Sequence, residues 1–163
     1  MSPHEFARLV DKHGPSLILY ARQWAPAPED VVQDAFLKLV ALRTKPREVV
    51  PWLYRVVRNA AIDAGKAARR REHREQAVAR PESWFLETAV HEFDAAKAID
   101  ALKSLPGEQR EVIVARLWGG LGFEQIGETA GCSGSTAFRR YSAGIESLRK
   151  ELGEPCPNPS PNV

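Results

Sequence analysis

Residues 123–137 have the sequence FEQIGETAGCSGSTA, and this order of small, apolar and capping residues is typical of a helix-turn-helix. Two helices that cross closely need a small residue at the crossing, which Gly127 supplies. The tight turn between them favours a residue that tolerates positive φ, here Gly131. Ser133 is a good N-cap for the second helix. The segment therefore predicts two helices separated by residues 131–133.

The second predicted helix has an apolar face and a polar face. Its expected buried residues recur every three or four positions: Ala137, Tyr141, Ile145, Leu148 and Leu152. Its polar side chains begin at its N-terminal end, which enters the DNA major groove in this motif: Ser135, Thr136, Arg139 and Arg140. Phe138 is a less usual groove residue, which contacts a thymine methyl or packs on a neighbouring helix. The alternative is an ordinary helical hairpin that happens to carry surface arginines. The N-cap, the small residue at the helix crossing, the glycine turn and the spacing of the apolar residues together favour a DNA-binding motif.

The apolar residues have a helical period along nearly the whole chain, and no convincing strand alternation appears. Ser2 to Glu5 has the pattern of a capping box that begins a helix, which we expect to end near Gly14 before a new run starts at Pro15. The further expected helices span residues 29–43, a long run from 51 that Gly65 weakens, 93–105 and 106–118.

We therefore predict an all-α fold of two small helical domains joined by a linker. The expected parts are a first domain over residues 1–76, a linker over 77–95, a helix-turn-helix domain over 96–152 and a disordered proline-rich tail over 153–163.

Charge is distributed unevenly along a chain whose net charge is only +2. Lysines and arginines outnumber acidic residues in the segment 45–75, and the balance reverses in 76–100. A basic block beside an acidic one indicates an element that binds a polyanion next to one with another role, although solvated helix faces are the commoner cause of charge runs.

The composition excludes several function classes. The two cysteines (Cys132 and Cys156) and the four histidines lack the spacing of metal ligands, and no nucleophile–base pair or phosphate loop is present. We therefore expect no catalytic residues, no metal, no cofactor and no enzymatic activity. No apolar stretch approaches the length of a membrane span, and residues 1–5 lack the start of a secretory signal. We expect a cytoplasmic protein without membrane insertion.

Three separated segments together resemble the sigma-70 family of RNA polymerase sigma factors, and most closely its short extracytoplasmic-function (ECF) group. Residues 28–39 (PEDVVQDAFLKL) are similar to the core-polymerase-binding helix of region 2. Residues 51–63 (PWLYRVVRNAAID), followed by Arg69-Arg70-Arg71, are similar to the helix that melts and reads the −10 promoter element. Residues 105–148 resemble region 4, whose helix-turn-helix reads the −35 element.

The resemblance implies a sigma factor with core RNA polymerase and promoter DNA as partners, and it leaves an anti-sigma partner open. The expected polymerase-binding residues lie on one polar helix side: Asp30, Gln33, Asp34 and Leu37. The expected DNA-binding residues of region 2 are Arg55, Arg58, Lys66, Arg69 and Arg70 for phosphates, and Asn59 and Asp63 for unstacked bases. In region 4 they are Ser135, Thr136, Phe138, Arg139 and Arg140. The free chain is expected to be a monomer.

Two alternatives to a sigma factor remain open from the sequence. A stand-alone helix-turn-helix regulator would bind a palindromic operator without polymerase, but it leaves residues 1–75 without a role. A sigma-like adaptor would bind polymerase without producing a promoter-dependent transcript.

Overall fold

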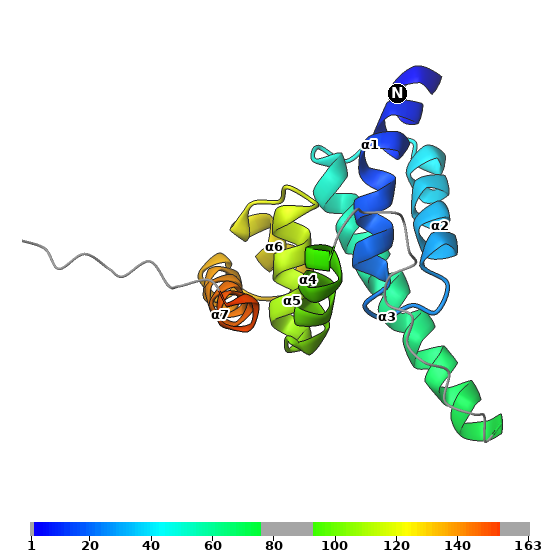
Figure 1. Ribbon diagram of the computed structural model, residues 1–163. Helices are drawn as coiled ribbons and strands as arrows, with labels where there is room; N and C mark the ends of the chain where they lie inside the picture. Colours follow the sequence, from blue (N-terminus) through cyan, green and yellow to red (C-terminus); the bar gives the residue numbers. More distant parts are fainter. Residues whose placement is uncertain (1, 76–92, 154–163) are drawn as a thin grey trace, which may run out of the picture.

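The computed structural model describes residues 2–75 and 93–153, and this part of the chain is helical, with no strand (Figure 1). Its helices, in chain order, are α1 (Pro3–Ala21), α2 (Pro28–Ala41), α3 (Val49–Glu75), α4 (Phe93–Ser104), α5 (Gly107–Leu117), α6 (Phe123–Ala130) and α7 (Gly134–Leu152). The expected all-α architecture is confirmed. Most of the expected linker, up to residue 92, and the tail from residue 154 lie outside the described residues.

The first three helices pack on one another around a common apolar core. Leu17 of α1, Leu39 of α2 and Leu53 of α3 are fully buried in it. Phe6 and Phe36 meet edge to face, with ring centroids 5.9 Å apart, and close the end of the α1–α2 pair. The predicted capping box is present, because the Ser2 hydroxyl accepts the Glu5 N–H and the Glu5 carboxylate accepts the Ser2 N–H.

The expected helix break at Gly14–Pro15 is wrong, since α1 continues through both residues to Ala21. A proline inside a helix removes one backbone hydrogen bond and crowds the preceding turn. The residues that follow it, Leu17 and Tyr20, are 0% and 1% exposed, so one continuous helix places both in the core. Burial of these large side chains outweighs the local cost of the proline.

Helix α3 likewise continues through Gly65, where a weakening was expected. A Cβ atom at this position would lie 2.3 Å from the carbonyl oxygen of Trp24, in the segment that follows α1. The glycine therefore allows the close approach of that segment to α3, a role that its helix propensity does not reveal.

The last four helices form a second unit around α7, which packs on α4, α5 and α6. Leu102, Leu105 and Ile113 are buried there, against the half-buried Ile145 and Leu148 of α7. Leu152, expected to be buried, is 43% exposed, because it is the last residue of α7 and lies beyond the packed turns.

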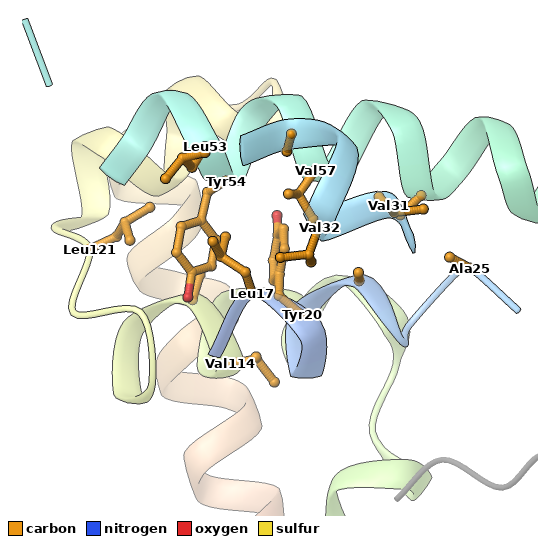
Figure 2. Close-up of a cluster of buried hydrophobic side chains, with 14 of the residues drawn as sticks. Leu17, Tyr20, Ala25, Val31, Val32, Leu53, Tyr54, Val57, Val114 and Leu121 are labelled. Atoms are coloured by element: carbon orange, nitrogen blue, oxygen red, sulfur yellow. The ribbon is translucent and has the colours of Figure 1, made fainter. Parts of the chain in front are cut away.

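The two units share one apolar cluster and lie against each other (Figure 1). Helix α5 packs on α1, and α6 packs on α3. Val114 and Leu121 of the second unit belong to the same buried cluster as Leu17 and Tyr54 of the first (Figure 2). The C-terminal end of α3 extends away from both units (Figure 1).

We predict that Gly65→Ala lowers the free energy of unfolding by about 1–3 kcal/mol, because the new methyl group collides with the Trp24 backbone. Helix propensity alone would predict a gain of about 1 kcal/mol. Gly14→Ala is the matched control, since nothing lies within 4 Å of the Cβ that it adds to α1. Urea unfolding followed by circular dichroism measures both. Equal stabilisation of the two variants would contradict the close approach.

Candidate nucleic-acid interface

The helix-turn-helix is formed by α6 and α7 with the geometry predicted for it. A Cβ at Gly127 would lie 2.6 Å from the Cys132 carbonyl oxygen, so the crossing requires a glycine. Gly131 has φ 73°, in the left-handed region, and ends α6. The Ser133 hydroxyl caps α7 by accepting the N–H of Thr136 at 3.1 Å. These local contacts fix the N-terminal turn of α7 relative to α6.

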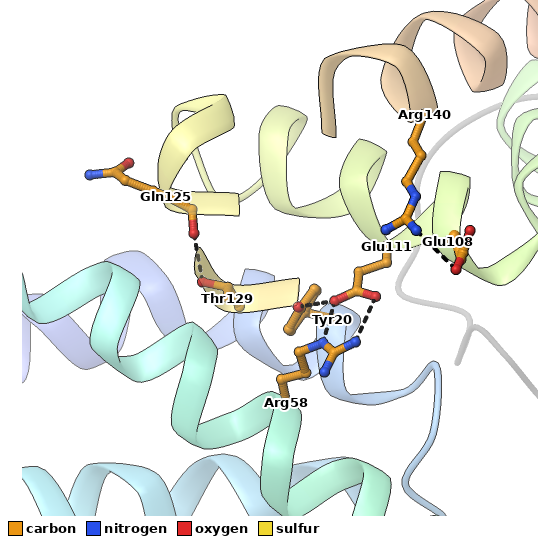
Figure 3. Close-up of polar contacts among 7 residues, drawn as sticks. All are labelled: Tyr20, Arg58, Glu108, Glu111, Gln125, Thr129 and Arg140. Atoms are coloured by element: carbon orange, nitrogen blue, oxygen red, sulfur yellow. Dashed lines mark hydrogen bonds and ion pairs between the residues drawn. The ribbon is translucent and has the colours of Figure 1, made fainter. Parts of the chain in front are cut away.

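The N-terminal half of α7 presents its predicted DNA-binding side chains at the surface. Ser135 and Arg139 are exposed, and Thr136 is half-buried beneath them. The Arg139 guanidinium donates to the Thr136 hydroxyl at 3.2 Å, which orients this arginine. Arg140 lies on the flank of the helix and forms an ion pair with Glu108 of α5 at 3.0 Å (Figure 3).

Phe138 fits both interpretations that the sequence offered, which are contact with a thymine methyl and packing on a neighbouring helix. It is 54% exposed, and its ring meets that of Phe123 edge to face with centroids 5.3 Å apart. One edge of the ring is therefore held by α6 while the rest faces outward beside Arg139.

Helix α3 carries the second predicted DNA surface, and most of its members are exposed. The exposed side chains are Arg55, Asn59, Asp63, Lys66, Arg69 and Arg70. Residues 55, 58, 62, 66 and 69 follow one another at steps of three or four and so lie along one face of the helix. The basic end of this face is on the part of α3 that extends away from both units (Figure 1).

Arg58 differs from its neighbours because it is drawn into the contact between the two units (Figure 3). Its Nε donates to Glu111 Oε1 at 2.6 Å, and its Nη2 donates to Glu111 Oε2 at 3.3 Å. The Tyr20 hydroxyl donates to the same Oε1 at 2.7 Å. The Glu111 side chain is only 7% exposed, so α1 and α3 supply the donors that a buried carboxylate requires.

Burial and charge shift the pKa values within this cluster. Burial raises the pKa of the Tyr20 hydroxyl well above its usual value, and the nearby negative charge of Glu111 raises it further, so Tyr20 stays a donor. Burial by itself would lower the pKa of the Arg58 guanidinium, but the hydrogen bond and charge of Glu111 raise it. Tyr20 and Arg58 thus keep the protons that their hydrogen bonds to Glu111 need.

Helix α2 presents the predicted polymerase-binding residues along its outer face. Asp30, Gln33 and Asp34 are exposed, and Leu37 is 59% exposed. Val31, Val32 and Ala35, which alternate with them in the helical period, are buried against α1 and α3.

A surface pocket lies between α3 and α6. It is lined by Pro46, Arg47, Glu48, Pro51, Trp52, Arg55, Glu128 and Thr129. Trp52 also packs against the apolar core. Within residues 2–75 and 93–153, no group of His, Cys, Asp and Glu is arranged to hold a metal ion. In the same part of the chain, no helix has the length and apolarity needed to cross a membrane.

Comparison with known proteins identifies the family. Two family models match the chain: Sigma-70 region 2 over residues 9–75, and Sigma-70, region 4 over residues 101–150. RNA polymerase sigma factor CarQ of Myxococcus xanthus is 31% identical over 160 residues, which cover 91% of this chain and 90% of CarQ. The chain belongs to the sigma-70 family of RNA polymerase sigma factors. This sigma factor also resembles ECF RNA polymerase sigma factor SigL of Mycobacterium tuberculosis, at 30% identity over 155 residues, covering 90% of this chain and 88% of SigL.

Two solved structures share the fold of this sigma factor. The sigma factor RpoE from Bartonella quintana, in complex with the anti-sigma factor NepR, has a TM-score of 0.69 at 23% identity and covers 91% of this chain and 97% of its own. CnrH, in complex with the cytosolic domain of CnrY, has a TM-score of 0.61 at 24% identity, with 95% and 92% covered.

Glu111 and Tyr20 are site residues that the sequence of this sigma factor did not predict. A signal was nevertheless present, because Glu111 begins the run 111–115, whose last four residues are all apolar. Such a run goes beyond one face of a helix, and a helix that is apolar all round is buried on several sides. Glu111 therefore had to be buried or to lie at the edge of a buried surface.

We predict that part of the folding stability of this sigma factor is lost above pH 10 through Tyr54. Burial raises the pKa of Tyr54 to about 12, whereas an unfolded tyrosine ionises near pH 10. Unfolding therefore releases this proton between the two values, so the stabilisation is complete below pH 10 and falls as the pH rises through that interval.

The corresponding loss is about 1 kcal/mol between pH 9 and pH 11. Urea unfolding at the two pH values measures it, with Tyr54→Phe as the control that retains the ring without the ionisable hydroxyl. The decrease in the variant should be smaller by that amount. An identical decrease in both proteins would contradict the raised pKa.

Proposed function

We propose that this ECF sigma factor binds core RNA polymerase through the outer face of α2 and recognises promoter DNA through α3 and α7. The observation that carries the proposal is the N-terminal turn of α7, which is capped by Ser133, seated on Gly127 and open at Ser135 and Arg139. A capped, exposed helix start with a basic flank is the arrangement that reads base edges in the major groove.

The −35 element is the proposed target of α7. Arg139 is free of acidic partners among the ion pairs of the described residues and is oriented by Thr136, which suits it to a guanine edge or a phosphate. Arg140, paired with the exposed Glu108, is suited to a phosphate at the groove margin, where the exposed ion pair exchanges at little cost.

The −10 element is the proposed target of α3. The basic side chains Arg55, Lys66, Arg69 and Arg70 are spaced along the helix so that they can follow a phosphate backbone. Asn59 and Asp63, one turn apart and exposed, offer hydrogen-bonding groups to unstacked bases beside that backbone.

The outer face of α2 fits a basic partner surface with an apolar pocket. Two exposed carboxylates, of Asp30 and Asp34, lie one turn apart, and Leu37 continues the same face with a largely exposed apolar side chain. Single exposed apolar side chains are common on protein surfaces, so the pair of carboxylates carries this assignment and Leu37 adds apolar contact area beside it.

The proposed role as a sigma factor also implies the kind of activity, the place of action and the oligomeric state. The role is regulatory and non-catalytic, and the site of action is the cytoplasm, where polymerase and DNA are found. The free chain is proposed to be a monomer of two linked domains, residues 1–76 and 96–152. The expected acidic linker and proline-rich tail lie largely outside the described residues and have no part in the proposal.

An anti-sigma partner is proposed from the likeness to RpoE, whose solved complex contains the anti-sigma factor NepR.

We predict that Asp30→Arg with Asp34→Arg abolishes co-elution with bacterial core RNA polymerase in size-exclusion chromatography, with affinity lowered about tenfold or more. The matched control reverses two exposed acidic residues elsewhere, with Asp11→Arg on α1 and Glu146→Arg on α7. The control should still co-elute. Absence of co-elution for the unmodified chain would favour a polymerase-independent regulator over a sigma factor.

We predict that Arg139→Ala with Arg140→Ala weakens promoter recognition by the reconstituted holoenzyme about tenfold, since a good base contact discriminates by about 1–3 kcal/mol. The probe is a set of genomic fragments selected by the unmodified holoenzyme, measured by filter binding. Arg149→Ala with Lys150→Ala removes the same charge from the other end of α7 and should retain most of the affinity. Unchanged selectivity in the first variant would show that α7 is not the recognition helix.

A further inference from the structure

One large apolar side chain lies in the middle of the polar, exposed face of α7. Residues 135, 138, 139 and 142 lie on this face because of their spacing, and all four are exposed. Phe138, at 54% exposure, lies between Ser135 and Ser142. A single exposed apolar side chain is ordinary on a protein surface, so exposure alone indicates nothing. What matters is that Phe138 adjoins Arg139 on the face that the proposed function directs into the major groove.

The Phe138 ring is supported by a second ring, that of Phe123 on α6. The two rings meet edge to face, with centroids 5.3 Å apart and an interplanar angle of 87°. Phe123 is itself held on other sides, by the Tyr141 ring at 5.4 Å and by the Arg116 guanidinium at 4.9 Å from its centroid. Arg116 also donates to the Leu121 carbonyl oxygen at 2.9 Å. Side chains from α5, α6 and α7 therefore fix the place of the exposed ring.

The chemistry of a phenyl ring limits what Phe138 can recognise in the groove. The ring has no hydrogen-bonding group and no charge, so it neither reads donors and acceptors nor neutralises a phosphate. Among the base edges in the major groove, thymine alone presents an apolar group, its 5-methyl. Placing the ring against a polar edge would remove water from that edge without giving a hydrogen bond in return, which is unfavourable. The side chain therefore selects for thymine and against the other bases.

We propose that Phe138 is a specificity-determining residue that contacts the 5-methyl group of a thymine in the −35 element, with Phe123 as its positioning residue. The inference rests on the proposed function of α7. Successive residues rise only about 1.5 Å along a helix, less than the spacing of about 3.4 Å between base pairs. The thymine should therefore lie within about two base pairs of the group that Arg139 contacts.

The test removes the methyl group and nothing else from the DNA. The probe is a synthetic duplex that copies the tightest of the fragments selected by the unmodified holoenzyme. A second duplex carries deoxyuridine in place of each thymidine in the −35 segment, since uracil keeps the donors and acceptors of thymine without its methyl. The holoenzyme, reconstituted with the full chain, should bind the uracil duplex about fourfold more weakly, as expected for one buried methyl group. Singly substituted duplexes then identify the thymine.

Three variants show whether Phe138 makes this distinction. Phe138→Ala should weaken binding of the thymine duplex about fourfold and bind the two duplexes equally. Arg139→Ala should weaken binding of both duplexes by one factor and keep the ratio between them. Leu152→Ala truncates an exposed apolar side chain at the other end of α7 and should keep both affinity and ratio. Added salt should lower every affinity but leave the ratio unchanged, because a methyl contact releases no counterions.

The positioning role of Phe123 is tested with the same ratio. Phe123→Leu removes the supporting ring and should bring the ratio close to one, whereas Phe123→Tyr keeps a ring there and should retain it. The ratio compares two duplexes with one protein preparation, so a partial loss of folded protein does not alter it. An unchanged ratio in Phe123→Leu would overturn the positioning role.

The remaining outcomes separate this inference from the proposed function on which it rests. Equal affinity of the unmodified holoenzyme for the two duplexes would overturn thymine recognition, and so would a selected −35 segment without thymine. A loss in Phe138→Ala that is the same for both duplexes would also overturn it, since the ring would then support the fold or a protein contact. If Arg139→Ala bound both duplexes as tightly as the unmodified chain, the proposed role of α7 would itself be wrong.

Discussion

The arrangement of the two units depends on one buried carboxylate. Glu111 lies on the packed side of α5, and a charge in that position is tolerated only if donors reach it. Those donors come from Tyr20 on α1 and Arg58 on α3, so satisfying one charge fixes α5 against two helices at once. Such a buried pair contributes little net stability compared with apolar residues of the same size, and its effect is on which arrangement forms. The apolar contacts around it, including Leu121 and Tyr54, supply the energy of docking.

The packing of the two units exposes the proposed binding surfaces to different extents. The N-terminal turn of α7 is left at the surface with Ser135 and Arg139 exposed, and the outer face of α2 stays open as well. On α3, Arg58 is drawn into the contact with Glu111, whereas Arg55 and Asn59 on either side of it stay exposed.

Local chemistry made much of the fold predictable. The capping box at Ser2, the N-cap at Ser133 and the left-handed turn at Gly131 each depend on residues within a few positions of one another, and all three predictions are confirmed. Reasoning from neighbouring residues alone also produced the wrong expectations at Pro15 and Gly65. Pro15 and Gly65 have poor helix propensity, but both lie inside helices, because Leu17 and Tyr20 need burial and the Trp24 backbone needs a residue without a Cβ.

The sequence by itself determined most of the helices, the capped ends at Ser2 and Ser133, the helix-turn-helix and the positions of the polar faces, since each of these follows from periodicity and nearest neighbours along the chain. Only the tertiary structure decided which carboxylate Arg58 binds and that the two units share a core. Glu111 is 53 positions from Arg58 and 91 from Tyr20, and no periodic pattern relates residues so far apart. Their pairing follows from the packing of α5 against α1 and α3, which is a property of the folded chain.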